Sequence, residues 1–157
     1  MVQLVPMSEA EFETYQERGV REYAMEHVEA GNWRQEEALQ RAEQEFRELL
    51  PNGMSSPDQY LFSIVDEKTG TKVGILWFAV QDRPAGRSAF VYDVEVFEQF
   101  RRHGYGTQAF LALEEKAREM GLKTIGLHVF GHNDAAREMY EKLGYVPKSI
   151  WMSKTVE

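Results

Sequence analysis

The sequence predicts an α/β fold of the α+β kind, with a mixed, mostly antiparallel sheet and flanking helices. Near residue 59 the hydrophobic periodicity changes from helical spacing to β-type runs. Three such runs then follow one another with only short turns between them, as in antiparallel hairpins. A long amphipathic helix next separates two further β-type runs, which is the arrangement of a parallel crossover.

The first third of the chain predicts one short strand and two helices. Residues 2–5 form an apolar strand candidate, and Ser8 and Glu11 have the spacing of a capping box that begins a helix. Gly19 marks a bend or break in this helix, and Gly31-Asn32 ends it. The second helix has one apolar side and stops at residues 51–53; that side holds Ala38, Ala42, Phe46 and Leu49 or Leu50.

The remaining elements follow from the turns and glycines that separate them. No repeat, low-complexity segment or linker divides the chain, so we expect one domain over residues 1–157. The expected elements are strands at 60–65, 73–80 and 88–96, a helix at 104–120, a strand at 124–129, a short helix that Asn133 or Asp134 caps and Gly144 ends, and a β-like tail at 145–155.

Composition excludes several classes of function. The net charge is −8, and residues 1–50 carry seven of those charges, with twelve Glu against five Arg. An acidic chain is a poor candidate for nucleic-acid binding, which depends on Lys and Arg contacts to phosphate. The chain has no cysteine, which removes disulfides, thiolate metal sites and a cysteine nucleophile. No apolar run approaches the roughly 20 residues of a membrane span, so we expect a cytoplasmic protein without a membrane partner.

Residues 94–107 are the most informative segment. An apolar strand is followed by a polar turn, by Arg101 and Arg102, and by Gly104 and Gly106 at the start of a helix. Free backbone N–H groups at a helix start bind phosphate, and glycines let the ligand approach the backbone. The two arginines add positive charge. The segment therefore predicts a site for a pyrophosphate-bearing cofactor.

One alternative is a dinucleotide-dependent oxidoreductase. Gly104-x-Gly106-x-x-Ala109 fits the loose form of the dinucleotide fingerprint. However, only about fifty residues follow, whereas the dinucleotide fold has several more βα units. The acidic residue expected about 20 positions later is missing, since Gly126 and His128 occupy that region.

A more specific resemblance involves two motifs. Residues 94–96 and 101–106 resemble the acetyl-CoA-binding motif of the GNAT-type N-acetyltransferases. Residues 127–133 and 136–145 resemble the second half of that family's core, in the family's order and spacing. The resemblance implies a GNAT-like sheet in which a parallel strand pair splays apart. It also implies acetyl-CoA as co-substrate, with no metal.

The resemblance also implies which residues hold the cofactor. The backbone of residues 94–96 would bind the pantetheine arm and the acetyl group, and residues 102–107 would wrap the pyrophosphate. Asn133 matches a position that contacts the arm, although Asn also suits a helix N-cap. The cofactor-binding candidates are Val94, Glu95, Val96, Arg101, Arg102, His103, Gly104, Tyr105, Gly106, Thr107 and Asn133.

Three residues are catalytic candidates. By resemblance, Tyr140 donates a proton to the departing CoA thiolate, and a tyrosine of pKa about 10 stays protonated for that purpose. Alternatively, Tyr140 is only a buried aromatic residue that packs the last helix. The attacking amine must lose a proton, and the candidate bases are Glu95, inside an apolar strand, and His128, where some family members carry a glutamate. Alternatively, Glu95 is a carboxylate on the surface and His128 is a structural histidine.

These observations together predict an N-acetyltransferase. It would transfer acetyl from acetyl-CoA to a primary amine of a small molecule or peptide, by direct attack in a ternary complex. The acceptor would lie against the N-terminal helices, whose glutamates favour a cationic amine. The enzyme would act as a monomer or homodimer. A non-catalytic acyl-CoA-binding sensor is a second alternative, and it would not depend on Tyr140.

Overall fold

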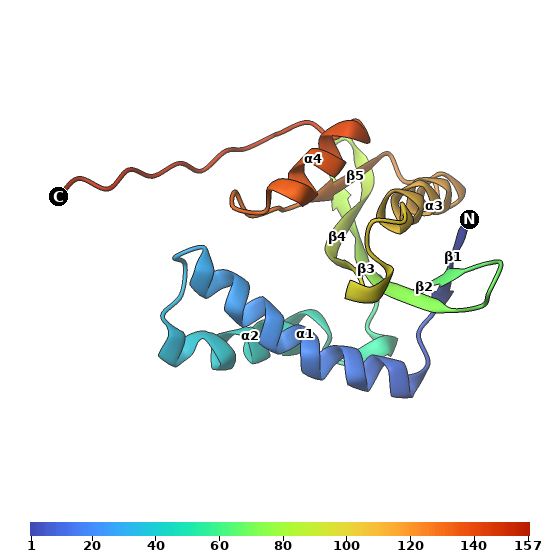
Figure 1. Ribbon diagram of the computed structural model, residues 1–157, viewed down its shortest axis with the longest axis horizontal. Coiled ribbons are helices and arrows are strands. Elements are labelled where there is room, and N and C mark those ends of the chain that lie inside the picture. The colour runs from blue at the N-terminus through green and yellow to red at the C-terminus, as the bar shows by residue number, and fades with distance from the viewer.

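A five-stranded sheet forms the centre of the computed structural model, which describes residues 1–157 (Figure 1). Its strands lie side by side in chain order. The first four are antiparallel to their neighbours, and the last pair is parallel, which confirms the predicted mixed sheet. The strands are β1 (Val2–Pro6), β2 (Gln59–Asp66), β3 (Lys72–Arg83), β4 (Gly86–Val96) and β5 (Thr124–Leu127).

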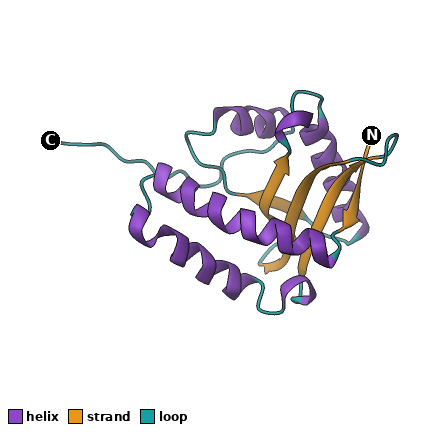
Figure 2. Cartoon of the chain, turned by 60° about the horizontal axis from the view of Figure 1, so that its bottom comes forward, coloured by secondary structure: helices purple, strands orange, loops and turns teal.

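Helices cover both faces of this sheet (Figure 2). One hydrophobic core joins the first two helices to one face, and a second joins the last two helices to the other. No helix has both the length and the apolar composition for crossing a membrane. The helices are α1 (Glu9–Glu29), α2 (Gln35–Leu49), α3 (Tyr105–Glu119) and α4 (Asp134–Lys142), with 3-10 turns at Gly53–Ser55 and Glu98–Phe100.

Helix α1 begins as the sequence predicts. The Ser8 hydroxyl accepts a hydrogen bond from the Glu11 N–H at 3.1 Å, and the Glu11 carboxylate accepts one from the Ser8 N–H at 2.9 Å. The predicted break at Gly19 is wrong, because the helix continues through it. A Cβ at this position would lie only 3.4 Å from the ring of Tyr15 and 3.5 Å from that of Phe46. The glycine therefore allows α1 and α2 to pack closely.

A β-bulge decides which residues of β4 face α1. Trp77 of β3 is opposite Asp93, but the next residue, Phe78, is opposite Val91, so Tyr92 is the extra residue. Directly opposite residues share a face of the sheet. Asp93 and Glu95 are opposite Trp77 and Ile75, which belong to the core beneath α1 and α2. Two carboxylates of β4 are therefore directed towards α1.

The two parallel strands separate soon after they meet. β4 and β5 pair only from Ser88–Thr124 to Val91–Leu127, whereas β4 continues to Val96. This confirms the splayed pair that the resemblance implies. The β-like tail is a wrong prediction: residues after Tyr145 form no strand and extend away from the body (Figure 1). No neighbouring strand lies beside them to accept their hydrogen bonds.

Candidate active site

The candidate site lies where β4 and β5 diverge. Beyond Val91, β4 has no partner on its β5 side, so residues 94–96 border the gap. A 3-10 turn and a short loop then lead to the start of α3. At this edge the Val96 carbonyl already accepts a hydrogen bond, from Arg101 Nε at 2.9 Å. Arg101 thus folds back along the strand.

The start of α3 presents a row of unused backbone donors. None of the N–H groups from Arg102 to Thr107 donates a hydrogen bond within the chain, and the first helical bond runs from the Gln108 N–H to the Gly104 carbonyl at 3.1 Å. Gly104 is the N-cap residue and has no side chain to cap the helix. These donors sit at the positive end of the helix dipole. The arrangement fits a diphosphate group such as that of CoA.

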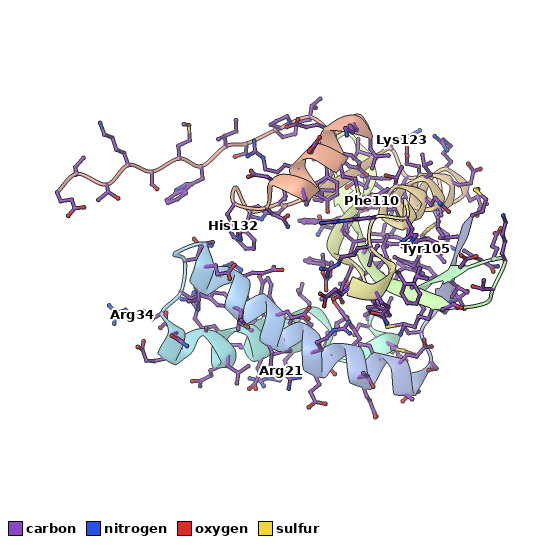
Figure 3. The ribbon with its side chains drawn as sticks, in the orientation of Figure 1. Arg21, Arg34, Tyr105, Phe110, Lys123 and His132 are labelled. Carbon is purple, nitrogen blue, oxygen red and sulfur yellow. The ribbon has the colours of Figure 1, made fainter.

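Side chains of this loop hold its shape. The His103 Nδ1 lies 2.8 Å from the Arg101 carbonyl, where its N–H donates a hydrogen bond. The Tyr105 hydroxyl donates to Asp66 at 2.5 Å and ties the helix start to the end of β2 (Figure 3). Arg102 has a left-handed backbone at φ 68, and its exposed guanidinium makes no ion pair. Its charge is therefore available to a ligand.

The two glycines of the motif have different reasons to be glycine. Gly104 adopts φ 78, a left-handed conformation that strains other residues, although a Cβ there would come no closer than 3.8 Å to Gln108. At Gly106 a Cβ would lie 3.0 Å from the Met139 sulfur. Gly106 therefore permits α3 to approach α4, a packing role that the sequence motif does not reveal.

Carboxylates gather on the α1 side of the gap. The buried Tyr15 hydroxyl donates to Asp93 at 2.6 Å. Arg18 Nη2 lies 2.7 Å from Glu95 Oε1 and forms an ion pair with it. The Glu95 side chain is 21% exposed, so it does not lie on the open surface.

This crowding changes the protonation of the carboxyl groups. Glu26 is exposed as a residue, but partial desolvation of its carboxyl group, followed by the negative charges of Asp93, Glu22, Glu29 and Glu95, raises its pKa to about 7. Burial also raises the pKa of Glu95, as does the charge of Glu22, while Arg18 opposes the shift. Glu26 is therefore a group that exchanges its proton near neutral pH.

Tyr140 faces the same region from α4. Its ring packs against Phe110 at 5.2 Å and against Tyr145 at 5.8 Å, and the residue is 9% exposed. Its hydroxyl makes no hydrogen bond within the chain, whereas burial, followed by the charges of Asp93 and Glu26, raises its pKa to about 12. The structure thus brings Tyr140, Glu26 and Asp93 within electrostatic reach of one another.

The loop after β5 connects to the carboxyl end of α1. The exposed His128 lies edge-on to Phe130 at 5.2 Å, and Phe130 contacts His27 of α1 at the same distance. His132 lies beside α1, 3.5 Å from Glu29 (Figure 3). The Asn133 side chain accepts a hydrogen bond from the Ala136 N–H at 3.3 Å, so its role as N-cap is confirmed.

The sequence analysis missed two groups, Glu26 and Asp93. Both had a signal. Asp93 precedes Glu95 by two residues and so shares its face of β4. Arg18, Glu22 and Glu26 recur at intervals of four and so share one face of α1.

Comparison with known proteins decides the family. The Acetyltransferase (GNAT) family matches residues 21–145, most of the chain. The chain belongs to the GNAT family. It is a GNAT N-acetyltransferase, and acetyl-CoA is the acyl donor of that family. Membership rules out the dinucleotide-dependent alternative, and the unused donors at the start of α3 fit the family's cofactor.

Two full-length relatives come from Bacillus subtilis (strain 168). The uncharacterized N-acetyltransferase YycN is 39% identical over 154 residues, which cover 98% of this chain and 97% of that protein. The uncharacterized N-acetyltransferase YdgE is 34% identical over 151 residues, or 96% of each. The crystal structure of YycN superposes with a TM-score of 0.94 and 37% identity, covering 100% of this chain and 99% of that chain.

A more distant structure supports the fold alone. A protein of Clostridium acetobutylicum, solved with acetyl-CoA, has a TM-score of 0.64 and 15% identity, and the match covers 99% of this chain and 96% of that chain.

Proposed function

We propose that this GNAT enzyme transfers acetyl to a primary amine of a small molecule or peptide, by direct attack while both substrates are bound. The observation that supports the proposal is that Glu26, whose pKa is raised to about 7, lies within electrostatic reach of the unbonded hydroxyl of Tyr140. One group accepts a proton near neutral pH and the other retains its proton. Acyl transfer to an amine needs both.

The cofactor side would be built from backbone. The N–H groups of residues 102–107 and the Arg102 guanidinium would hold the diphosphate, and the unpaired edge at residues 94–96 would align the arm. Asn133, at the start of α4, would contact the arm, as the resemblance implies. Acetyl-CoA supplies an acetyl group as a thioester, with a thiolate as the leaving group.

We assign removal of the amine proton to Glu26. An amine arrives mainly as ammonium, which has no lone pair for attack, and a carboxylate with pKa near 7 takes the proton at the operating pH. Glu95 is engaged by Arg18, and His128 is exposed beyond the end of β5. We prefer Glu26 to both sequence candidates because its pKa is raised to about 7 and its carboxylate forms no ion pair.

Tyr140 would act as the acid. Burial and the charges of Asp93 and Glu26 raise its pKa to about 12, so the phenol stays protonated at neutral pH. Its hydroxyl has no partner within the chain and is free to donate to the departing sulfur. The buried ring of Phe110 and the half-buried ring of Tyr145 pack against the Tyr140 ring and fix its position.

The acceptor would be a cationic amine. Glu22, Glu26, Asp93 and Glu95 lie in one cluster, and Arg18 balances only part of their charge. A second positive group on the acceptor, as in a diamine, polyamine or basic peptide, would find a partner there.

An amine screen tests the proposal. Purified protein is mixed with acetyl-CoA and single amines, and release of the CoA thiol is followed with a chromogenic disulfide. We expect turnover with primary amines, and a higher kcat/KM for diamines than for neutral monoamines of equal length. Equal rates for the two sets would contradict the cationic preference. Thiol release with hydroxyl acceptors but with no amine would contradict the proposed reaction.

A further inference from the structure

Gly74 of β3 lies directly against the part of β4 that borders the gap. It is opposite Val96 in the register of the two strands. A Cβ built on Gly74 would overlap the Glu95 carbonyl oxygen, and it would lie 3.0 Å from the Glu95 carbonyl carbon and 3.1 Å from the Val96 Cα. All three atoms belong to the backbone, so no flexible side chain can move aside to make room. Only glycine allows the two strands to approach each other in this way.

The hydrogen-bond register shows which way the polar groups of Val96 point. The Phe97 N–H donates to the Val73 carbonyl at 2.8 Å, so these two residues form a hydrogen-bonded pair. Bonded and non-bonded pairs alternate along an antiparallel ladder. The next pair, Gly74 and Val96, is therefore non-bonded, and the N–H and carbonyl of Val96 point away from β3. The Val96 carbonyl fits this direction, since it accepts its hydrogen bond from Arg101.

The Val96 N–H consequently faces the gap. β5 pairs with β4 only as far as Val91, so no strand of the sheet lies beside this N–H. The Glu95 carbonyl and the Val96 N–H belong to one planar trans peptide and point in opposite directions. The position of the N–H in the gap thus depends on how closely the carbonyl approaches β3, and the absence of a side chain at Gly74 sets that approach.

We propose that Gly74 is a positioning residue for acyl transfer: it lets the Glu95–Val96 peptide lie against β3 and so directs the Val96 N–H at the thioester of acetyl-CoA. The inference rests on the proposed function, which places the acetyl group beside residues 94–96. A methyl group on Gly74 would displace this peptide into the gap by on the order of 1 Å, and a misplacement of that size costs about a hundredfold in rate.

The start of α3 contacts the same residue of β4. Gly106 lies so close that a Cβ there would be 3.9 Å from the Val96 Cγ2. Val96 is thus held by a glycine of the cofactor motif and by a glycine of β3 that lies outside the motif. Displacement of the strand at Gly74 would therefore be opposed by α3 and would strain the site rather than shift it as a whole.

Amide hydrogen exchange of the wild-type protein, followed by NMR, tests the direction of this peptide. The Val96 N–H should exchange quickly without cofactor and should slow by about tenfold or more when acetyl-CoA is bound. The Phe97 N–H is bonded to β3 and should be slow in both states. If acetyl-CoA leaves the exchange of the Val96 N–H unchanged, the acetyl group does not lie beside this strand. That result would contradict the proposed cofactor arrangement and this inference together.

Gly74→Ala tests the glycine itself. The kcat per folded enzyme, measured with an amine from the screen, should fall about a hundredfold. The Kd for CoA, measured by calorimetry, should change little, because the backbone N–H groups at residues 102–107 are formed by a separate segment. A purely structural role would lower the Tm without separating kcat from CoA affinity.

Gly86→Ala is the matched control, at the opposite end of β4. Gly86 has φ 128, and a Cβ there would lie 2.9 Å from the Lys123 Cγ, so this substitution also strains the pair of β3 and β4. It should lower the Tm and leave kcat unchanged.

Three results would overturn the role of Gly74 while the proposed function stands, provided that acetyl-CoA still protects the Val96 N–H in the wild type. One is a Gly74→Ala enzyme with normal kcat, and another is an equal loss of kcat in Gly86→Ala. The third is a Gly74→Ala chain that does not fold even with CoA present, because the glycine would then serve the sheet as a whole.

Discussion

The two sides of the candidate site are made in different ways. The cofactor side consists of backbone: a left-handed loop, the N–H groups at the start of α3 and the free edge of β4. The acceptor side consists of side chains from α1, β4 and α4 that burial and mutual charge have shifted in pKa. A backbone site depends on a few contiguous residues, whereas a side-chain site depends on how distant segments pack. The following variants test this contrast.

The largest effect is expected from Tyr140→Phe. Loss of the proton donor should lower kcat by about 10² to 10⁴-fold. The ring stays in its pocket beside Phe110, so folding is preserved. The affinity for CoA, measured by calorimetry, should change little, since the diphosphate site lies on the other side. A large loss of CoA affinity with normal kcat would place Tyr140 on the cofactor side instead.

Glu26→Gln should lower kcat/KM by about a hundredfold at neutral pH. The wild-type kcat/KM should also fall as pH drops below about 7, because the raised pKa of Glu26 leaves it protonated there. This fall at acidic pH, the acidic limb of the pH profile, should disappear in the Glu26→Gln variant.

Glu22→Gln is the control, because it removes one charge that raises the pKa of Glu26. The limb should persist and move to lower pH. If the Glu26→Gln variant retained the limb while Glu95→Gln lost it, the base would be Glu95.

Tyr15→Phe tests the rigidity of the acceptor side. The variant leaves the half-buried Asp93 without its 2.6 Å donor, and an unsatisfied polar group shielded from water costs about 1–3 kcal/mol of unfolding free energy. The matched control, Tyr105→Phe, removes a bond to Asp66 on the cofactor side, where solvent replaces the partner. Urea denaturation should show the smaller loss for Tyr105→Phe. Equal losses would mean that the two sides are equally solvated.

Gly104→Ala should give the smallest effect. A left-handed conformation costs a residue with a Cβ roughly 1–2 kcal/mol, so both stability and CoA affinity should fall about tenfold as the loop shifts. Gly121→Ala has the same strain, at φ 73 with open space around it, but it lies after α3 and far along the chain from the loop. Gly121→Ala should reduce stability by about as much as Gly104→Ala and leave the CoA affinity unchanged. Equal affinity losses in both variants would show that the effect is general destabilisation.

Most of the fold could be predicted because its signals are local. The capping box at Ser8, the turn chemistry between strands and the glycine after α4 each fix an element boundary within a few residues. Gly19 could not be read correctly, since its purpose is to let Phe46 of another helix approach. The composition of residues 145–155 predicts a strand, but none forms, because a strand also needs a neighbouring strand to pair with.

The sequence by itself predicts the proposed cofactor side, since its donors, its left-handed turn and its charges all come from residues 94–107 and their local backbone preferences. Only the tertiary structure decided the acceptor side. A β-bulge at Tyr92 directs Asp93 and Glu95 towards α1, and packing of that helix over β4 brings the exposed Glu26 close to like charges. Burial and proximity shift a pKa, and neither is a property of a residue until the chain has folded around it.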